Sequence, residues 1–95
     1  MRRFTWDAKK ARGNLAGHKV VFETAVTVFA DPNAQIRLDD EPTEERWRIT
    51  GLTSDGTLLF VVYTERDEDE GIHTHIISAR KATRREREAY FASDP

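Results

Sequence analysis

The sequence predicts an α+β fold: a compact domain with an antiparallel sheet of about four strands, two N-terminal helices and one C-terminal helix. Apolar residues at helical spacing are confined to the first third of the chain, whereas the middle shows strand-like alternation. A complete helix-start motif follows near residue 83. A chain of 95 residues is expected to form one domain, residues 1–95, with a single small core.

The N-terminal third predicts one strand and two helices. Residues 3–6 (RFTW) are a candidate strand, after which Asp7 can cap a helix because its carboxylate accepts hydrogen bonds from the first turn. Gly17 is placed to end that helix. A second helix is predicted over residues 22–29 from apolar residues at i, i+3, i+4 and i+7, and the turn at residues 31–33 (DPN) closes it.

The middle of the chain predicts strands. In residues 45–52 (ERWRITGL), Trp47 and Ile49 alternate with Arg46 and Arg48, so one face is apolar and the other is cationic. Helices are expected mainly on the apolar face, which leaves the face of the arginines open. The remaining expected elements are an edge strand at 34–38, a central strand at 57–64, a strand at 73–79, and an acidic hairpin loop at 65–71 (ERDEDEG).

The C-terminal segment predicts a capped helix with arginines in its first turn. Residues 83–86 (TRRE) fit the capping box. Arg84 and Arg85 lie where the helix dipole disfavours cations by roughly 0.3 to 1 kcal/mol each. A bound anion would reverse that penalty, and Arg80 and Lys81 could add to such a cluster. The alternative is that these arginines only keep an exposed helix soluble.

Composition excludes several classes of function. There is no cysteine, so disulfides, thiolate zinc sites and cysteine nucleophiles are excluded. No signal peptide or run of roughly 20 apolar residues is present, so a cytoplasmic protein without membrane contact is expected. The net charge is −2, but residues 1–19 and 80–88 are basic whereas residues 31–45 and 65–70 are acidic. This segregation could form one basic face with acidic loops.

The histidines are the candidate proton carriers. His73 and His75 share a strand face, but a third ligand is not evident, so no metal site is predicted. His75 on the face of Arg46 or Arg48 could carry a proton, and its alternative is a half-exposed strand histidine. His18, at the end of the first predicted helix, could instead stabilise the helix terminus. The motifs of phosphate-binding loops, serine hydrolases and metalloproteases are missing.

Four segments together resemble the BrnT family, the toxin half of a bacterial type II toxin–antitoxin system. They are Phe4-x-Trp6-Asp7-x-x-Lys10-x-x-x-Asn14-x-x-x-His18, Phe22-x-x-Ala25-x-x-x-Phe29, Glu45-Arg46 with Gly51, and Ile77-Ser78-Ala79-Arg80-Lys81-Ala82-Thr83 continuing through Glu86 and Tyr90. The resemblance spans nearly the whole chain, and ISARKAT with the following ExxxY is its most specific part. This chain has His75 where the family usually has arginine.

The resemblance implies a RelE-like compact fold and a ribonuclease that blocks translation. It also implies a BrnA-type antitoxin, a ribbon-helix-helix protein that neutralises the toxin. Operator DNA would be contacted only by this antitoxin and not by the toxin itself. Such a ribonuclease needs no cofactor or metal, because the 2′-hydroxyl of RNA can be the nucleophile. The protein then supplies a proton acceptor, a proton donor and cations for the developing charge.

The candidate site residues follow from this reading. The predicted charge stabilisers are Arg46 and Arg80. The candidate proton carriers, left unranked, are His75, His18 and Glu45. The predicted substrate-binding residues are Lys10, Arg48, Lys81, Arg84 and Tyr90, with Tyr90 orienting the substrate. The alternative function is a non-catalytic RNA- or protein-binding module, either a corepressor with its antitoxin or an inactive toxin relic.

Overall fold

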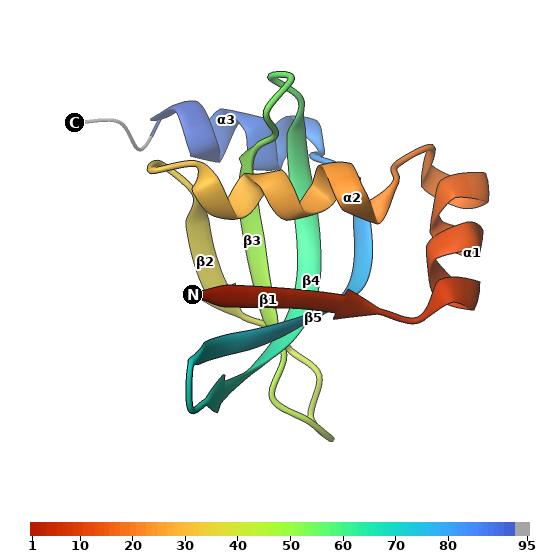
Figure 1. The fold of residues 1–95 in the computed structure, drawn as a ribbon. Coiled ribbons are helices and arrows are strands. Elements are labelled where there is room, and N and C mark those ends of the chain that lie inside the picture. Colours follow the sequence, from red (N-terminus) through yellow and green to blue (C-terminus); the bar gives the residue numbers. More distant parts are fainter. Residues whose placement is uncertain (93–95) are drawn as a thin grey trace.

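A computed structural model describes residues 1–92 and contains three α-helices, one 3-10 helix and five strands (Figure 1). In chain order these are β1 (Arg2–Trp6), α1 (Ala8–His18), α2 (Phe22–Ala25), η1 (Val26–Ala30), β2 (Gln35–Leu38), β3 (Trp47–Leu52), β4 (Leu58–Glu68), β5 (Gly71–Lys81) and α3 (Arg84–Ala92). No helix within residues 1–92 has the length and apolar character needed to cross a membrane.

The α+β class is confirmed, but the sheet differs from the expected four antiparallel strands. Five strands are arranged in the order β1-β5-β4-β3-β2. β1 pairs in parallel with β5, so that Arg2 lies beside Ile72 and Trp6 beside Ile76, while the other three pairings are antiparallel. The parallel pair joins segments about 70 residues apart in the chain, and no local pattern marks such a long-range pairing.

The core lies between the sheet and the α2–η1 segment. Phe22, Ala25 and Val28 are buried against the inward residues of the sheet, which include Ile49 and Val61. The predicted helix over residues 22–29 is therefore correct in position, although it is an α-helix only to Ala25 and continues as a 3-10 helix. This segment crosses one face of the sheet (Figure 1).

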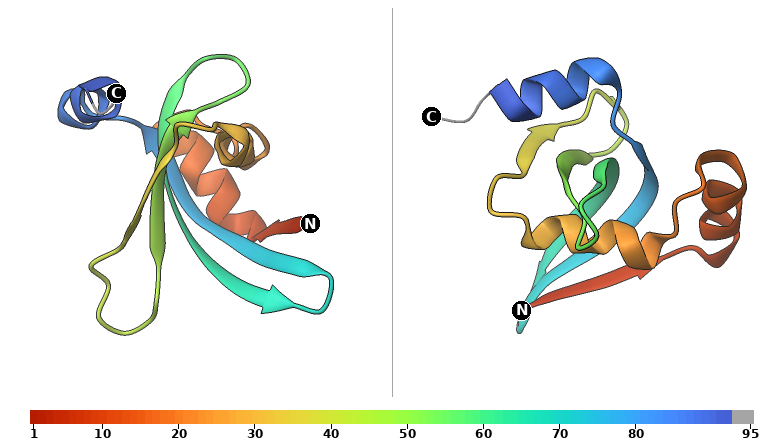
Figure 2. Two further views of the ribbon diagram at one scale, coloured as in Figure 1. Left: turned by 90° about the vertical axis from the view of Figure 1, so that its left-hand side faces the viewer. Right: turned by 90° about the horizontal axis from the view of Figure 1, so that it is seen from above.

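The helices are not all on one face. α3 lies on the opposite side of the sheet from α2 and η1 (Figure 2), where Ala89 faces Thr50 and Phe60 across a hollow. The expectation that the face of Arg48 is left open is thus correct only in part, because α3 covers one end of it. The capping box accounts for the start of α3: Thr83 N–H donates to Glu86 Oε1 at 2.8 Å, and Glu86 N–H donates to Thr83 Oγ1 at 3.2 Å.

The predicted acidic loop is mostly strand. β4 continues to Glu68 and β5 begins at Gly71, which leaves only Asp69 and Glu70 as the turn. Cross-strand pairing overrides the low strand propensity of acidic residues here. Gly71 has φ +141°, and a Cβ there would lie 1.8 Å from the Met1 carbonyl oxygen, so only glycine lets β1 begin at this point.

Asn14 joins α1 to the sheet. The helix begins as predicted, since Asp7 Oδ1 accepts the Lys10 N–H at 3.0 Å, but it ends at His18 rather than Gly17. The Asn14 side chain donates to the Ala79 carbonyl at 2.7 Å and accepts the Ala79 N–H at 3.0 Å. The Asn14 side chain therefore supplies hydrogen-bond partners to the backbone of β5 at Ala79, beyond the point where β1 ends.

A β-bulge changes which residues of β5 share a face. Tyr63 pairs with Ile76, but Val62 pairs with Ser78, so Ile77 is the extra residue. Simple alternation would place residues 75 and 80 on opposite faces. Because of the bulge, His75 and Arg80 lie on the same face, the one directed away from α2 and η1.

Candidate functional site

The face of the sheet directed away from α2 and η1, here called the open face, carries most of the polar side chains of the strands. Strand pairing arranges them in rows. The first row is Gln35, Thr50, Phe60 and Arg80; the second is Arg37, Arg48, Val62 and Ser78; the third is Thr64, His75 and Thr5; the fourth is Arg66, His73 and Arg3.

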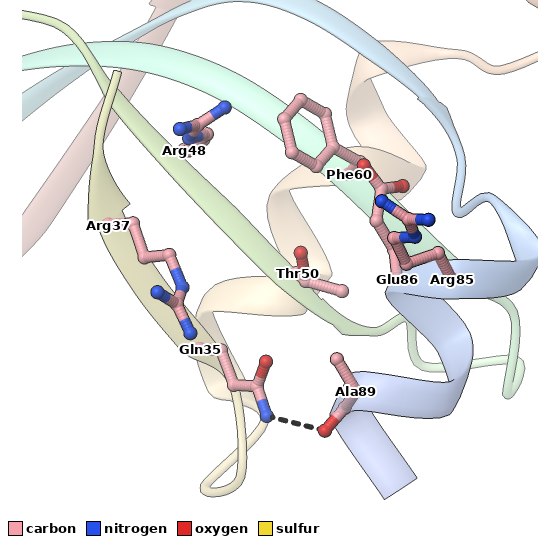
Figure 3. Close-up of a pocket in the computed structure, with 8 residues that line it drawn as sticks. All are labelled: Gln35, Arg37, Arg48, Thr50, Phe60, Arg85, Glu86 and Ala89. Atoms are coloured by element: carbon pink, nitrogen blue, oxygen red, sulfur yellow. Dashed lines mark hydrogen bonds between the residues drawn. The ribbon is translucent and has the colours of Figure 1, made fainter. Parts of the chain in front are cut away.

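At one end of the open face, α3 and the first two rows enclose a hollow of about 220 Å³. Figure 3 shows its lining residues, which we call the arginine hollow: Gln35, Arg37, Arg48, Thr50, Phe60, Arg85, Glu86 and Ala89. Gln35 donates from Nε2 to the Ala89 carbonyl at 3.3 Å, which joins β2 to α3. Three guanidinium groups and one aromatic ring are therefore gathered around a single concave surface.

Arg48, one of the predicted substrate-binding residues, lines the arginine hollow. Its guanidinium is 3.6 Å from Asp40 and 4.0 Å from Asp39, at the limit of an ion pair. Its buried Nε has no hydrogen-bond partner within residues 1–92. A buried guanidinium nitrogen without an acceptor is energetically unfavourable, so an anionic ligand that reached it would gain binding energy.

Arg80 borders the arginine hollow and is held by protein groups. Two of its nitrogens donate to the two carboxylate oxygens of Glu86 at 2.8 and 2.9 Å, and its guanidinium lies 4.1 Å from the centre of the Phe60 ring. The hydrogen bond from Arg80 is the main reason that the pKa of Glu86 is lowered. An anion was expected beside Arg80 at the start of α3, and the Glu86 carboxylate occupies that place.

At the other end of the open face, a second hollow of about 560 Å³ is lined by residues of the third and fourth rows and by three glutamates. We call it the histidine hollow; it is lined by Glu44, Glu45, Thr64, Glu65, Arg66, His73 and His75. His75 and Glu45, two of the three candidate proton carriers, thus lie in one place. Two of the three glutamates are in ion pairs, Glu44 with Arg46 at 2.7 Å and Glu65 with Arg2 at 3.1 Å.

The two histidines of this hollow share one hydroxyl group. Thr5 Oγ1 lies 2.6 Å from His73 Nε2 and 2.9 Å from His75 Nδ1. The pairing of β1 with β5 produces this contact, because it sets Thr5 directly beside His75. Because Nδ1 of His75 is bonded to Thr5, Nε2 is the ring nitrogen that remains to contact a ligand in the histidine hollow.

Arg46 lies at the edge of the histidine hollow. It precedes β3, which begins at Trp47 rather than at residue 45 as expected. Its Nε donates to Glu44, and this hydrogen bond is the main reason that the pKa of Arg46 is raised. Two predicted residues, Arg46 and Glu45, therefore belong to the neighbourhood of His75 and not to that of Arg80.

The remaining predicted residues lie apart from both hollows. Lys10 and His18 are exposed on α1, which packs beside β5. Lys81 faces the other side of the sheet, where it lines a surface depression with Lys19 and Thr24. Arg84 is 92% exposed and lies 3.8 Å from Glu88, one helical turn away.

Tyr90 is buried, and its hydroxyl donates to Asp31 at 2.6 Å. It therefore contributes to the attachment of α3, while Arg85 and Ala89 are the α3 residues that join Glu86 in lining the arginine hollow. From its position four residues after Glu86 alone, a tyrosine that packs in the core cannot be distinguished from one that contacts a ligand.

The fold also brings to the two hollows residues that were not predicted from the sequence. Arg37 and Phe60 enter the arginine hollow because they pair with Arg48 and Arg80, respectively, and such pairings are not readable from either strand alone. Arg85 stands next to Arg84 but on a different side of the helix, since successive residues turn by about 100°. Thr5 could not be recognised as a neighbour of His75 from the sequence, because the strand with which it pairs was not known.

The arrangement of possible metal ligands is sparse. Within residues 1–92, no three histidine, aspartate or glutamate side chains are grouped so as to hold a metal ion. His73 and His75 remain a pair, and each directs a ring nitrogen to Thr5.

Comparison with known families identifies the class of protein. Residues 6–86 match the family model described as "Ribonuclease toxin, BrnT, of type II toxin-antitoxin system". The match covers most of the chain and includes every residue that lines the two hollows except Ala89. The chain belongs to the BrnT family.

The fold agrees with this assignment. The crystal structure of the Brucella abortus ribonuclease toxin BrnT superposes with a TM-score of 0.61 and 17% sequence identity, over 88% of this chain and 99% of that chain. At this identity the likeness concerns the fold alone. No curated protein matches this sequence significantly.

Proposed function

We propose that this protein is the toxin of a type II toxin–antitoxin system, a metal-independent endoribonuclease that cleaves RNA and thereby inhibits translation. One observation carries the proposal beyond the family description. A single open face holds a cationic hollow with an aromatic wall at one end and, at the other, a histidine oriented by a second side chain.

The arginine hollow is the proposed binding site for the RNA backbone. Arg37, Arg48 and Arg85 present guanidinium groups that fit phosphate oxygens. Phe60 offers apolar surface to a ribose or base, as aromatic side chains do in proteins that bind single-stranded RNA.

The histidine hollow is the proposed place of cleavage. His75 Nε2 accepts the proton of a ribose 2′-hydroxyl as that oxygen attacks the adjacent phosphorus. The new O2′–P bond forms while the P–O5′ bond breaks, and the departing 5′ oxygen takes a proton from solvent in the open hollow. The products are a 2′,3′-cyclic phosphate and a 5′-hydroxyl. Arg46, which is bonded to Glu44 at the edge of this hollow, is the proposed cation for the phosphorane charge, and Glu45 favours the imidazolium that forms.

The two hollows bind different parts of the substrate in this proposal. Phe60 and Thr64, the β4 neighbours of Arg80 and His75, are four residues apart, which corresponds to roughly 13 Å along the strand. The arginine hollow therefore holds a different phosphate from the one that is cleaved, more than one nucleotide away. The same separation favours a second candidate function, an RNA-binding module without catalysis, because the three guanidinium groups of the arginine hollow are remote from the histidine.

Cleavage assays with purified protein distinguish the two functions. We expect His75→Ala to abolish cleavage of a single-stranded RNA while RNA binding persists, and His18→Ala, the same change on α1, to leave cleavage intact. EDTA is expected to have no effect. RNA binding with strong salt dependence but no cleavage by the unmodified protein would favour the binding module.

A BrnA-type antitoxin of the ribbon-helix-helix class is the proposed protein partner, with operator DNA contacted only through it. The neighbouring open reading frame should encode such a small protein. Its co-expression is expected to restore growth to cells that produce the toxin. Growth inhibition that the neighbouring protein does not relieve would count against this pairing.

A further inference from the structure

Four side chains from β1, β4 and β5 form a continuous series that ends at His75. Glu68 Oε2 lies 3.9 Å from His73 Nδ1, His73 Nε2 lies 2.6 Å from Thr5 Oγ1, and Thr5 Oγ1 lies 2.9 Å from His75 Nδ1. None of these contacts is needed to form the core, since Glu68 is exposed and the other three are only half-buried.

The hydroxyl between the two rings restricts where protons can lie. Thr5 has one O–H proton to donate, and a neutral imidazole carries one proton on either of its two nitrogens. If Thr5 donates to His73 Nε2, then His75 must donate its Nδ1–H to Thr5. If Thr5 donates to His75 Nδ1 instead, His73 must carry its proton on Nε2. Thr5 can also accept hydrogen bonds from both rings.

Glu68 distinguishes among these arrangements. Its carboxylate faces His73 Nδ1, and the negative charge favours a proton on that nitrogen. Arg3 donates to both oxygens of Glu68, at 3.3 and 2.7 Å, and this bonding lowers the pKa of Glu68, so the carboxylate stays charged at neutral pH. With its proton on Nδ1, neutral His73 can only accept at Nε2.

We infer that Glu68, His73 and Thr5 hold His75 as the tautomer that carries its proton on Nδ1 and leaves Nε2 as a proton acceptor facing the histidine hollow. Thr5, His73 and Glu68 are thus positioning residues, which act on the reaction through His75. The catalytic benefit of this arrangement rests on the proposed function, whereas the tautomer itself is a property of the free protein.

The arrangement also suits a residue that gains and loses a proton. When His75 accepts a proton at Nε2, its Nδ1–H bond to Thr5 is unchanged, and Thr5 continues to donate to His73. The proton transfer therefore requires no side chain of the series to reorient, which lowers the cost of the step.

Nitrogen-15 NMR of the imidazole rings at neutral pH tests the inference directly, because it separates protonated from unprotonated ring nitrogens. The chain has three histidines, so His75→Gln and His18→Gln variants assign the signals. We expect a protonated Nδ1 and an unprotonated Nε2 for His75. A protonated Nε2 in the unmodified protein would overturn the inference.

Two matched substitutions test the roles of the positioning residues. Thr5→Val removes the hydroxyl, whereas Thr5→Ser retains it; Glu68→Gln removes the charge with little change in shape. We expect Thr5→Val and Glu68→Gln to shift His75 toward a mixture of tautomers and to lower kcat for RNA cleavage, by less than the roughly 100- to 10,000-fold contribution of a general base. Thr5→Ser should preserve both. An unchanged tautomer in Glu68→Gln would overturn the assigned role of Glu68.

The outcomes separate this inference from the proposed function. The expected tautomer in a protein that never cleaves RNA would support the inference and contradict the proposed function. Cleavage by a protein whose His75 carries its proton on Nε2 would support the function and overturn the inference. Should Thr5→Val fail to fold, the spectrum of the unmodified protein and the Glu68→Gln variant still decide the matter.

Discussion

The hydroxyl of Tyr90 donates a hydrogen bond of 2.6 Å to Asp31 Oδ2 and so attaches α3 to the residue that directly follows η1. The same oxygen accepts the Leu52 N–H at 2.8 Å. Burial, together with the hydrogen bond and the charge of Asp31, raises the pKa of Tyr90 to about 12. One carboxylate thus joins α3, η1 and β3, which positions the wall of the arginine hollow.

Tyr90→Phe is expected to lower the free energy of unfolding by about 1.5 to 3 kcal/mol, the range for a hydrogen bond to a charged group. Cleavage per folded molecule should change little, because the lost contact belongs to the attachment of α3. Urea denaturation and a cleavage assay on the same preparation measure both quantities. Loss of activity with unchanged stability would instead support Tyr90 as a substrate-orienting residue.

Stability is expected to depend on two carboxylates at low pH. Burial raises the pKa of Asp31, but hydrogen bonds from Leu52, Tyr90 and Asn33 outweigh it, so the pKa lies below its usual 3.8. The pKa of Glu86 is lowered from 4.5, mainly by Arg80. A group with a lowered pKa stabilises the fold above its unfolded pKa and loses this contribution as the pH falls through the folded value.

We therefore expect the free energy of unfolding to decrease as the pH falls below about 4.5, within a window set by these two groups. Asp31→Asn should be less stable at neutral pH and should show a smaller loss on acidification. Thermal unfolding followed by circular dichroism between pH 3 and 7 measures the dependence. An identical pH profile in Asp31→Asn and the unmodified protein would contradict the assignment.

Glu86 has two roles that substitutions can separate. Glutamine can still accept the Thr83 N–H of the capping box but cannot pair with Arg80 by charge. Because the ion pair is partly exposed, Glu86→Gln should cost less than about 1 kcal/mol, whereas Glu86→Ala, which also removes the cap, should cost about 1 kcal/mol more. Equal losses in the two variants would show that capping contributes nothing measurable.

Arg48→Ala is expected to weaken RNA binding and to reduce the slope of log K against log salt by about 1, as the loss of one phosphate contact does. Arg84→Ala is the matched control, because Arg84 is highly exposed and lies outside the arginine hollow. Fluorescence anisotropy with a labelled RNA at several salt concentrations measures both slopes. Equal slopes in the two variants would contradict the proposed phosphate site.

Local features of the fold could be predicted from the sequence. The caps at Asp7 and Thr83 lie within three residues of their partners, so their chemistry is visible in a short segment. The pairing of β1 with β5 was not predictable, because it joins residues about 70 positions apart and depends on the whole topology. The lengths of β4 and β5 were underestimated, since acidic residues there are held by cross-strand pairing.

The site was predictable in part for the same reason. Arg48 and His75 were recognised from charge and alternation and Glu45 from the family resemblance, and each lines one of the two hollows. That His75 and Arg80 share a face depends on the single extra residue Ile77, which no alternation pattern reveals. Thr5 became relevant only through its register beside His75.

The amide of Asn14 has a further consequence for how molecules of this protein behave toward one another. A strand edge with free N–H and C=O groups can recruit the strand of another molecule and start aggregation. By binding both backbone groups of Ala79, Asn14 closes that part of β5 to intruding chains. Asn14→Ala would therefore open a template for self-association during high-level expression, and size-exclusion chromatography of the variant should reveal oligomers that the unmodified protein does not form.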